Sequence, residues 1–326
     1  MKTMKALVAQ QYGQPETYRV VDVPVPAPAA GEILVRVHAS AVNMADLRVA
    51  RGDLRNFVQL PFPHVLGADF AGTVIEVGAD VNRYAVGDEV FGYTTAAALA
   101  PFGGPNSPTG TGSMAEYLTV KADTPFVGQR PPQLDAISAA ALATTGLTAR
   151  AIGLTANLRD GERVLVVGAT GAVGTALLSL LSRYNVDITA TSRPDQHEAV
   201  RKLGAHHTIG FDPAEYPTDV DVVLNAALPG NALTPLVAVL RPGGRLLTVV
   251  PPPPSPSEYG RPEVDITYVA DADGNLGGMK ELSQLALAGG IRAVVAKTVP
   301  LSDAAEAYAD FAQGGLLGKL TVVPDF

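Results

Sequence analysis

Short stretches in which apolar and polar positions alternate fill the first third of the chain. Residues 33–40 alternate as a strand with one buried face does. Residues 70–77 and 89–92 add further short apolar strands, and turns at 78–80 and 87–88 separate them. Helical periodicity becomes clear only from Asp135 onward. We therefore expect a β-rich amino-terminal part, followed by a region of different architecture.

Strand and helix patterns alternate after residue 151, which favours a doubly wound parallel sheet and an α/β fold. The expected strands are 163–167, 187–191, 220–225 and 244–250, and the expected helices are 175–184, 195–203 and 232–240. Near the end we expect a helix over 302–313, capped by Ser302, and a last strand over 319–323.

A glycine-rich segment lies between the strand 163–167 and the helix that follows it. It consists of Gly168, Ala169, Thr170, Gly171, Ala172, Val173 and Gly174. Glycines allow a tight turn and a close approach of the backbone to a pyrophosphate, and the first amides of the helix then face the phosphates. The spacing is GxxGxxG rather than the commoner GxGxxG, and a purely structural turn is the alternative. The order of strand, turn and helix favours a dinucleotide site.

The end of the next expected strand indicates which dinucleotide binds. Ser192 and Arg193 stand where an NAD-specific site carries an acid that holds the ribose 2′-hydroxyl. A hydroxyl and a guanidinium suit a 2′-phosphate instead. We therefore predict that the cofactor is NADPH, with a surface arginine as the simpler alternative.

Composition excludes several classes of protein. The chain has 326 residues, enough for two domains, and its net charge of −8 argues against a nucleic-acid partner. It contains no cysteine, so disulfides and thiolate metal sites are impossible. We see no apolar stretch approaching the roughly eighteen residues that span a membrane, and no signal-peptide pattern at the start. We expect a cytoplasmic enzyme with no membrane partner.

Several short motifs resemble, in their order and spacing, the medium-chain dehydrogenase/reductases, and among these the zinc-free quinone oxidoreductases that include zeta-crystallin. They are 39–46, 66–72, 77–90, 112–117, 146–149, 168–174 and Gly318-Lys319. The resemblance covers essentially the whole chain. It implies a GroES-like β-rich catalytic domain of residues 1–128 and 291–326, and a Rossmann NADPH-binding domain of residues 129–290. It also implies an active site in the cleft between the two domains.

Departures from the zinc-dependent branch of this superfamily indicate that no metal is bound. Asn43 stands where that branch has its first cysteine ligand, and Ala68 stands in place of its histidine. Only His206 and His207 resemble a metal-binding pair, and neighbours in an extended segment point to opposite faces. We therefore expect hydride transfer without a Lewis acid, to acceptors that delocalise charge themselves.

Two residues near the vacated metal position are candidates for catalysis. Asn43 is the best candidate to donate a hydrogen bond to the developing oxyanion, and the alternative is a turn residue that bonds its own backbone. Arg48 stands where many quinone reductases carry a tyrosine; it could attract an anionic substrate or be a solvated surface residue. Asp46 we expect to brace the following helical turn.

Further cofactor contacts follow from the resemblance and from position at the carboxyl edge of the sheet. The resemblance implies that Thr148 bonds the nicotinamide or its ribose, and that Lys319 reaches back to the cofactor. Asn225 and Val250 end two of the expected parallel strands. For Thr148 an ordinary helix position is the alternative, and for Lys319 an exposed strand position.

Three functions remain open. The leading one is an NADPH-dependent reductase of quinones or α,β-unsaturated carbonyls. The second is an enoyl-thioester reductase of a fatty-acid or polyketide pathway, and the third is a catalytically idle NADPH-binding sensor or partner protein. Residues 264–270 read as an unpaired edge strand, which favours a homodimer.

Overall fold

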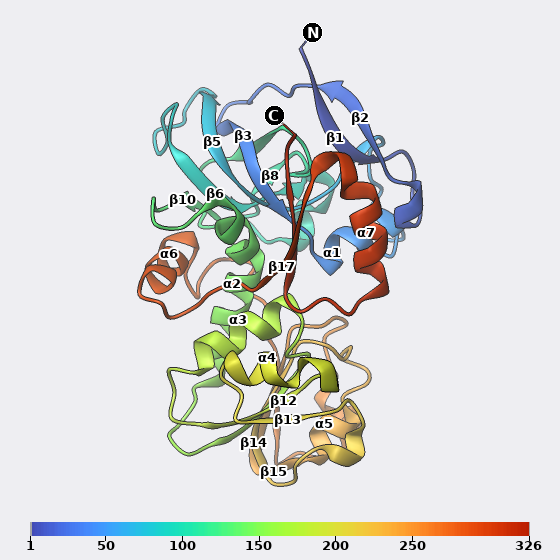
Figure 1. The fold of residues 1–326 in the computed structure, drawn as a ribbon, viewed down its shortest axis with the longest axis vertical. Helices are drawn as coiled ribbons and strands as arrows, with labels where there is room; N and C mark the ends of the chain where they lie inside the picture. The colour runs from blue at the N-terminus through green and yellow to red at the C-terminus, as the bar shows by residue number, and fades with distance from the viewer. Residues whose placement is uncertain (1, 326) are drawn as a thin grey trace. The chain divides into compact units, whose positions relative to one another are not determined.

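A computed structural model describes residues 2–325, and it divides into two compact units (Figure 1). The first unit contains the residues up to Thr144, Ala272–Leu287 and the residues from Val295 on. The second contains Thr145–Asp271 and Ala288–Val294. This division falls at other residues than the expected domain boundaries, which stay predictions.

Packing in the first unit explains why 272–287 does not group with the parallel sheet. Helix α6 (Met279–Leu287) lies on strand β10 (Val127–Gln129), and a Cβ atom at Gly128 would lie 2.6 Å from Cβ of Met279. The Met279 amide also donates to the Pro125 carbonyl at 2.8 Å. The absence of a side chain at Gly128 therefore allows the helix to rest on this edge strand.

The first unit is rich in antiparallel strands, as the alternating pattern predicts. Its elements besides β10 and α6 are β1 (Thr3–Ala9), η1 (Pro15–Thr17), β2 (Arg19–Pro24), β3 (Glu32–Ala41), α1 (Met44–Arg51), β4 (His64–Val65), β5 (Asp69–Val77), β6 (Glu89–Tyr93), β7 (Thr95–Ala96), η2 (Ala97–Phe102), β8 (Thr109–Gly110), β9 (Tyr117–Lys121), β17 (Val295–Pro300), η6 (Leu301–Asp303), α7 (Ala304–Gln313) and β18 (Lys319–Val323). The larger sheet has the order β10-β6-β5-β3-β9-β8-β7, and β18 joins it beside β3.

Strand pairing brings three distant segments together at the end of β3. Ala41, the last residue of β3, pairs with Asp69 of β5 and with Thr321 of β18. The Val42 amide then donates to the Leu320 carbonyl at 3.0 Å. The first residues of β5 and β18 therefore flank the chain where it leaves β3 and enters α1.

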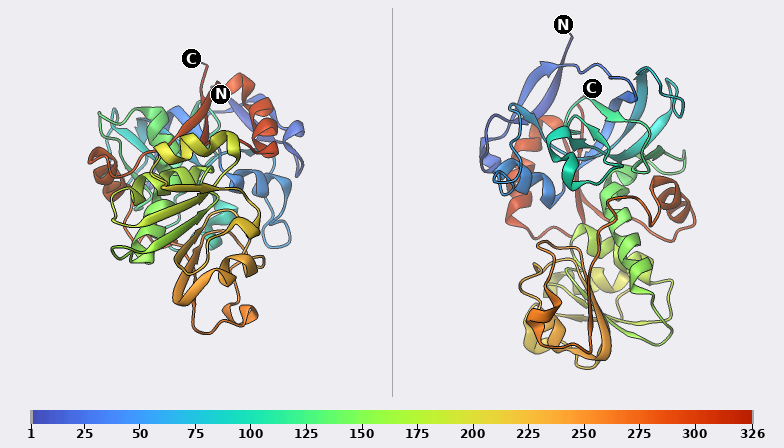
Figure 2. Two further views of the ribbon diagram at one scale, coloured as in Figure 1. Left: turned by 60° about the horizontal axis from the view of Figure 1, so that its bottom comes forward. Right: turned by 180° about the vertical axis from the view of Figure 1, so that it is seen from behind.

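The second unit holds a six-stranded sheet in which every pairing is parallel (Figure 2, left). Its elements are β11 (Arg163–Val167), α3 (Ala172–Leu181), β12 (Asp187–Thr191), η3 (Pro194–Gln196), α4 (His197–Lys202), β13 (His207–Ile209), η4 (Pro213–Glu215), β14 (Val220–Asn225), α5 (Thr234–Ala238), β15 (Leu240–Thr248), η5 (Pro256–Tyr259) and β16 (Asp265–Tyr268). The order β13-β12-β11-β14-β15-β16 is that of a Rossmann fold. The strand order reverses between β11 and β14, where such folds bind their ligands.

Expected and observed elements agree closely for the central strands. Strands 163–167, 187–191, 220–225 and 319–323 have the predicted bounds. Helix α3 begins three residues earlier than expected because Gly171 is already its N-cap. Ser302 is not the cap of α7: it lies in the 3₁₀ turn η6, and its hydroxyl donates to Asp325 Oδ1 at 3.0 Å. β13 and β17 were not predicted.

β16 ends the parallel sheet, as expected for an edge strand, because it pairs only with β15 among the described residues. A second copy of the chain on this edge stays a prediction.

Helix α2 (Ala136–Ala156) is the longest helix and runs across the division between the units. By length and composition it could cross a membrane, which differs from the expectation that no apolar stretch is long enough. The helix is rich in alanine and has few charged residues, so its mean hydropathy is high. Of its most apolar window, 61% is buried inside the protein, and buried core helices pass the same test.

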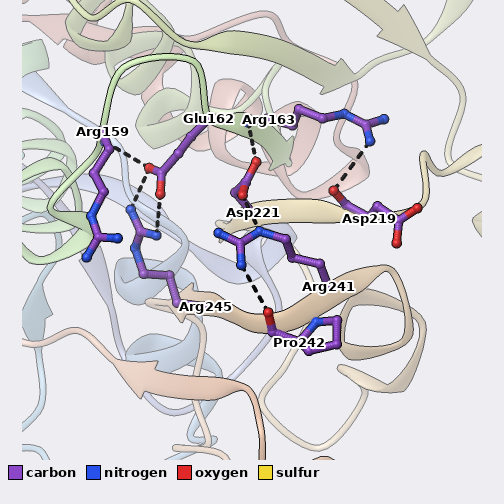
Figure 3. Close-up of polar contacts among 8 residues, drawn as sticks. All are labelled: Arg159, Glu162, Arg163, Asp219, Asp221, Arg241, Pro242 and Arg245. Atoms are coloured by element: carbon purple, nitrogen blue, oxygen red, sulfur yellow. Dashed lines mark hydrogen bonds and ion pairs between the residues drawn. The ribbon is translucent and has the colours of Figure 1, made fainter.

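A charged network lies where strands β11 and β14 begin (Figure 3). Arg245 donates two hydrogen bonds to Glu162, at 2.8 and 2.7 Å, and a third to the Ala156 carbonyl at 2.6 Å. Beside this pair, Asp221 accepts from Arg241 and from the Arg163 amide. Arg245 thus joins the carboxyl end of α2 to the sheet. Its guanidinium holds the pKa of Glu162 below the usual value for a glutamate.

We predict that Glu162→Gln lowers the free energy of unfolding by about 3 kcal/mol, since it leaves a largely buried guanidinium without its charge partner. Glu162 and Arg245 are only 7% and 18% exposed. Because the folded pKa of Glu162 is lowered, its contribution is present above the unfolded pKa, about 4.3, and is lost as the pH falls through the folded value. Urea unfolding at pH 7 and pH 3.5 measures both effects.

The matched control is Glu198→Gln, which removes the exposed pair between Glu198 and Lys202 in the same unit. We expect no measurable change from it, because an exposed pair is screened by water. Equal unfolding midpoints for both variants would contradict the role given to Glu162.

Candidate active site

The glycine turn of the second unit has the geometry of a phosphate cradle. Gly168 leaves β11 with a φ of 84°, in the left-handed region that favours glycine. The Gly171 amide donates back to the Gly168 carbonyl at 3.1 Å, which closes the turn. A Cβ atom at Gly174 would lie only 2.1 Å from that same carbonyl oxygen. Helix α3 therefore starts as close to the strand as the backbone permits.

The first amides of α3 belong to Ala172, Val173 and Gly174. Amides at this position have no partner within their own helix, and they lie at the positive end of the helix dipole. Together with the turn residues Ala169 and Thr170, they form the loop that sequence analysis assigns to the pyrophosphate. The geometry fits that group.

The two residues after β12 differ in exposure. The Arg193 side chain is 45% exposed, and its guanidinium lies 3.3 Å from Asp195 Oδ2. Ser192 is completely buried, and its hydroxyl has no hydrogen-bond partner among the described residues. A buried hydroxyl cannot meet an incoming phosphate without a rearrangement. Of the pair, Arg193 is therefore the better placed for the expected 2′-phosphate contact.

Asn225 organises the carboxyl edge of the sheet. Its Nδ2 donates to Thr248 Oγ1 at 2.8 Å and to the Leu228 carbonyl at 2.7 Å. Its Oδ1 accepts from the amides of Ala227 and Leu228. These bonds use both donors and both lone pairs of the amide, so the side chain has none left for a cofactor. The side chain of Asn225 thus shapes the loop and joins β14 to β15, and a contact of this residue with a cofactor stays a prediction.

Val250 follows strand β15 and Thr148 lies in helix α2. Their contacts with a cofactor stay predictions. The Val250 amide donates to Thr248 Oγ1 at 3.3 Å, just beyond the end of β15. Thr148 is a half-buried residue of α2.

A buried polar cluster fills the point in the first unit where β3, β5 and β18 meet. Asp69 is its centre and has no exposed surface. Its Oδ1 accepts from the amide and the hydroxyl of Thr144, and its Oδ2 accepts from Asn43 Nδ2 at 3.0 Å. The Lys319 ammonium lies 3.0 Å from the same Oδ2. Four donors therefore surround one carboxylate.

Lys319 is the first residue of β18 and is 1% exposed, which excludes the exposed strand position that sequence analysis left open. Besides pairing with Asp69, its ammonium donates to Asn43 Oδ1 at 2.5 Å. The expected reach of Lys319 to a cofactor stays a prediction. What the structure shows is that this lysine binds Asn43 and Asp69.

Asp46 braces the start of helix α1, as expected. Its Oδ2 accepts from the Asn43 amide at 2.8 Å, and its own amide donates to the Asn43 carbonyl at 3.1 Å. Burial raises the pKa of Asp46 to about 7, and the charge of Asp69 acts in the same direction. The ammonium of Lys319 and the hydrogen bond from Asn43 oppose this rise.

Arg48 and the histidine pair lie outside this cluster. Arg48 Nε lies 3.6 Å from Asp53 Oδ2, and both side chains are partly exposed. His206 and His207 do not point apart as expected, since both rings lie within 4 Å of Asp187 Oδ1. The reason is that β13 begins only at His207, so the pair is not one regular extended segment. Among residues 2–325, no group of three potential ligands lies close enough to hold a metal.

Asp69 and Thr144 were not predicted as parts of the site. The one available signal was Asp69 itself, a carboxylate within the otherwise apolar and small-residue segment 66–72. A buried charge requires a partner, but the sequence does not show which cation supplies it.

Comparisons with known proteins agree with this architecture. The model of the alcohol dehydrogenase GroES-like domain matches residues 29–129, and that of a zinc-binding dehydrogenase matches residues 198–322. The chloroplastic quinone-oxidoreductase QR1 of Triphysaria versicolor is 28% identical over 345 residues, covering 99% of each chain. A solved quinone oxidoreductase from Coxiella burnetii is 27% identical, with a TM-score of 0.83 and 99% of both chains covered. The human mitochondrial NAD(P)H oxidoreductase RTN4IP1 is 32% identical over 228 residues, 64% of this chain and 54% of that protein.

The β-rich first unit and the parallel Rossmann sheet of the second define a medium-chain dehydrogenase/reductase. Within this superfamily, the chain belongs to the quinone oxidoreductase family and is an NAD(P)H reductase of that type.

We predict that Gly174→Ala weakens NADPH binding by about tenfold or more, because the new Cβ atom must push helix α3 away from the Gly168 carbonyl. Titration of NADPH fluorescence measures the dissociation constant. The matched control is Gly171→Ala. Its φ is −71°, and its Cβ atom would meet no protein atom nearer than 3.5 Å, so we expect helix α3 to stay in place and the loss of affinity to be smaller than for Gly174→Ala. Equal affinities of the two variants would contradict the cradle.

Proposed function

We propose that this protein is an NADPH-dependent reductase that delivers hydride, without a metal, to a quinone or an α,β-unsaturated carbonyl. The observation that carries the proposal is the buried cluster of Asp69, Lys319 and Asn43 at the end of β3. The names of the quinone oxidoreductase relatives support the substrate class.

The donor set of the cluster does not suit a zinc ion. Zinc in enzymes prefers thiolate and imidazole ligands, and Asn43 and Ala68 stand where those ligands would be. Moreover, the Lys319 ammonium already lies against the one carboxylate of the cluster. A divalent cation would have to displace a buried positive charge to reach Asp69. The local electrostatics therefore favour chemistry without a metal.

The two charged neighbours fix the orientation of the Asn43 amide. Lys319 can only donate and ionised Asp69 can only accept, so Oδ1 of Asn43 must face the ammonium and Nδ2 the carboxylate. One N–H bond of Nδ2 is then left for a substrate. The hydrogen bond from a cation to Oδ1 also polarises the amide, which strengthens that remaining donor. We propose that it stabilises the negative charge that develops on the acceptor oxygen.

The second unit supplies the cofactor site of this proposal. Bound NADPH provides the hydride. The amides at the start of α3 would hold its pyrophosphate, and Arg193 would pair with its 2′-phosphate. Arg48 already pairs with Asp53, so the structure offers no specific support for its attracting a thioester's phosphates. The cytoplasmic location stays part of the proposal.

An acceptor screen tests the proposed activity. NADPH oxidation is followed at 340 nm with a quinone, an enone and crotonyl-CoA, before and after treatment with EDTA. We expect turnover with the first two, unchanged by EDTA. Tight NADPH binding without turnover of any acceptor would favour an idle binding protein, and activity lost together with stoichiometric zinc would contradict the mechanism.

Asn43→Ala sharpens this test. We expect kcat to fall by about a hundredfold or more, because one oxyanion donor is lost. NADPH affinity should not change, because Asn43 is not part of the phosphate cradle. A variant with normal kcat would show that Asn43 has only its structural role at the start of α1.

We predict that Arg193→Ala raises the KM for NADPH by about tenfold or more and leaves that for NADH almost unchanged. A charge-assisted hydrogen bond to phosphate contributes about 1.5–3 kcal/mol, and NADH has no group to receive it. Initial rates with both cofactors measure the effect. Equal KM values for NADPH and NADH in the wild type would contradict the assignment.

A further inference from the structure

The carboxyl group of Asp46 is held at one oxygen only. Its Oδ2 accepts from the Asn43 amide at 2.8 Å, and among the described residues no other donor binds the carboxyl. Asp46 keeps part of its surface accessible, and its Oδ1 is not among the buried atoms that lack a partner. The brace of helix α1 therefore uses only Oδ2 of Asp46 and leaves Oδ1 available to water or a ligand.

The neighbours of Asp46 come from several elements. Asp69 on β5 and Lys319 on β18 act on it electrostatically. Two buried tyrosines also lie within electrostatic range, Tyr308 on α7 and Tyr18 just before β2. The charge of Asp46 raises the pKa of each phenol. The Tyr308 hydroxyl has no hydrogen-bond partner in the part of the chain that the structure describes. The surroundings thus offer little that stabilises a second negative charge beside Asp69.

Neither of the two phenols can release a proton as readily as Asp46. Asp69 already accepts from four donors. Lys319 lies against that carboxylate. Burial raises the pKa of Tyr18 to about 12 and that of Tyr308 well above its usual value. Asp46 has a pKa of about 7, so near neutrality a large share of its carboxyl groups carries a proton.

We propose that the carboxyl group of Asp46 gives the proton that completes reduction of the acceptor bound at Asn43. The inference rests on the proposed function. Hydride addition carries two electrons to the acceptor and leaves a negative charge on its oxygen. The O–H bond of Asp46 then breaks, the proton joins the reduced acceptor, and the electron pair stays on the carboxylate. Water restores the proton through the accessible Oδ1, so each turnover consumes one hydride and one proton.

Asp46→Asn separates proton donation from the brace, since its amide oxygen can still accept from the Asn43 amide. We expect kcat at pH 6.5 to fall by about a hundredfold, the usual contribution of a positioned acid. In the wild type, where the protonated form is required, kcat should decline as the pH rises through about 7. This decline, and any solvent isotope effect on kcat, should vanish in the variant. NADPH affinity, measured by fluorescence, should be unchanged.

A second measurement requires neither an acceptor nor turnover by the variant. Infrared difference spectra of the wild type between pH 5 and 9, compared with those of Asp46→Asn, should reveal one carboxyl band that titrates near pH 7. A carboxylate ionised over that whole range, or a variant with unchanged kcat and pH profile, would overturn the role of Asp46 alone. Absence of turnover by the wild type with every acceptor would overturn the proposed function, and this inference with it.

Discussion

The ion pair between Lys319 and Asp69 is the interaction on which the first unit depends. Both side chains are almost completely buried, and each would be strongly unfavourable there without the other. The pair also ties the first residue of β5 to the first residue of β18, a strand from the end of the chain. The segment that holds β18 is therefore part of the site, because among residues 2–325 it supplies the one cation that pairs with Asp69.

This pair acts on the two polar groups beside it, Asn43 and Asp46. Asn43 alone would be an amide of undefined orientation at the start of a helix; between a donor-only and an acceptor-only group it has one orientation. Asp46 lies one helical turn further. The carboxylate of Asp69 raises its pKa, and the ammonium of Lys319 lowers it. Burial is the larger influence and raises its pKa to about 7. One pair of charges thus shapes both polar groups beside it.

The parts of the structure that sequence predicted are those that depend on local pattern. The bounds of β11, β12, β14 and β18 follow from short apolar runs between turn residues. The glycine turn follows largely from spacing, because a Cβ atom at Gly171 or Gly174 would lie nearest to the Gly168 carbonyl of the same loop. The brace that Asp46 provides at the start of α1 was also predicted correctly. Asn225 was placed at the correct edge, although its side chain proved to bind the loop itself.

The parts that sequence missed depend on pairing between distant segments. Nothing near Lys319 in the chain indicates that it is buried, since a lysine at the start of a strand is usually exposed. Its burial follows only from β18 lying beside β3, which brings the ammonium to a carboxylate at the start of β5. The two sites therefore differ in kind. The phosphate cradle consists of backbone amides that one loop provides, whereas the polar cluster consists of side chains that three strands bring together.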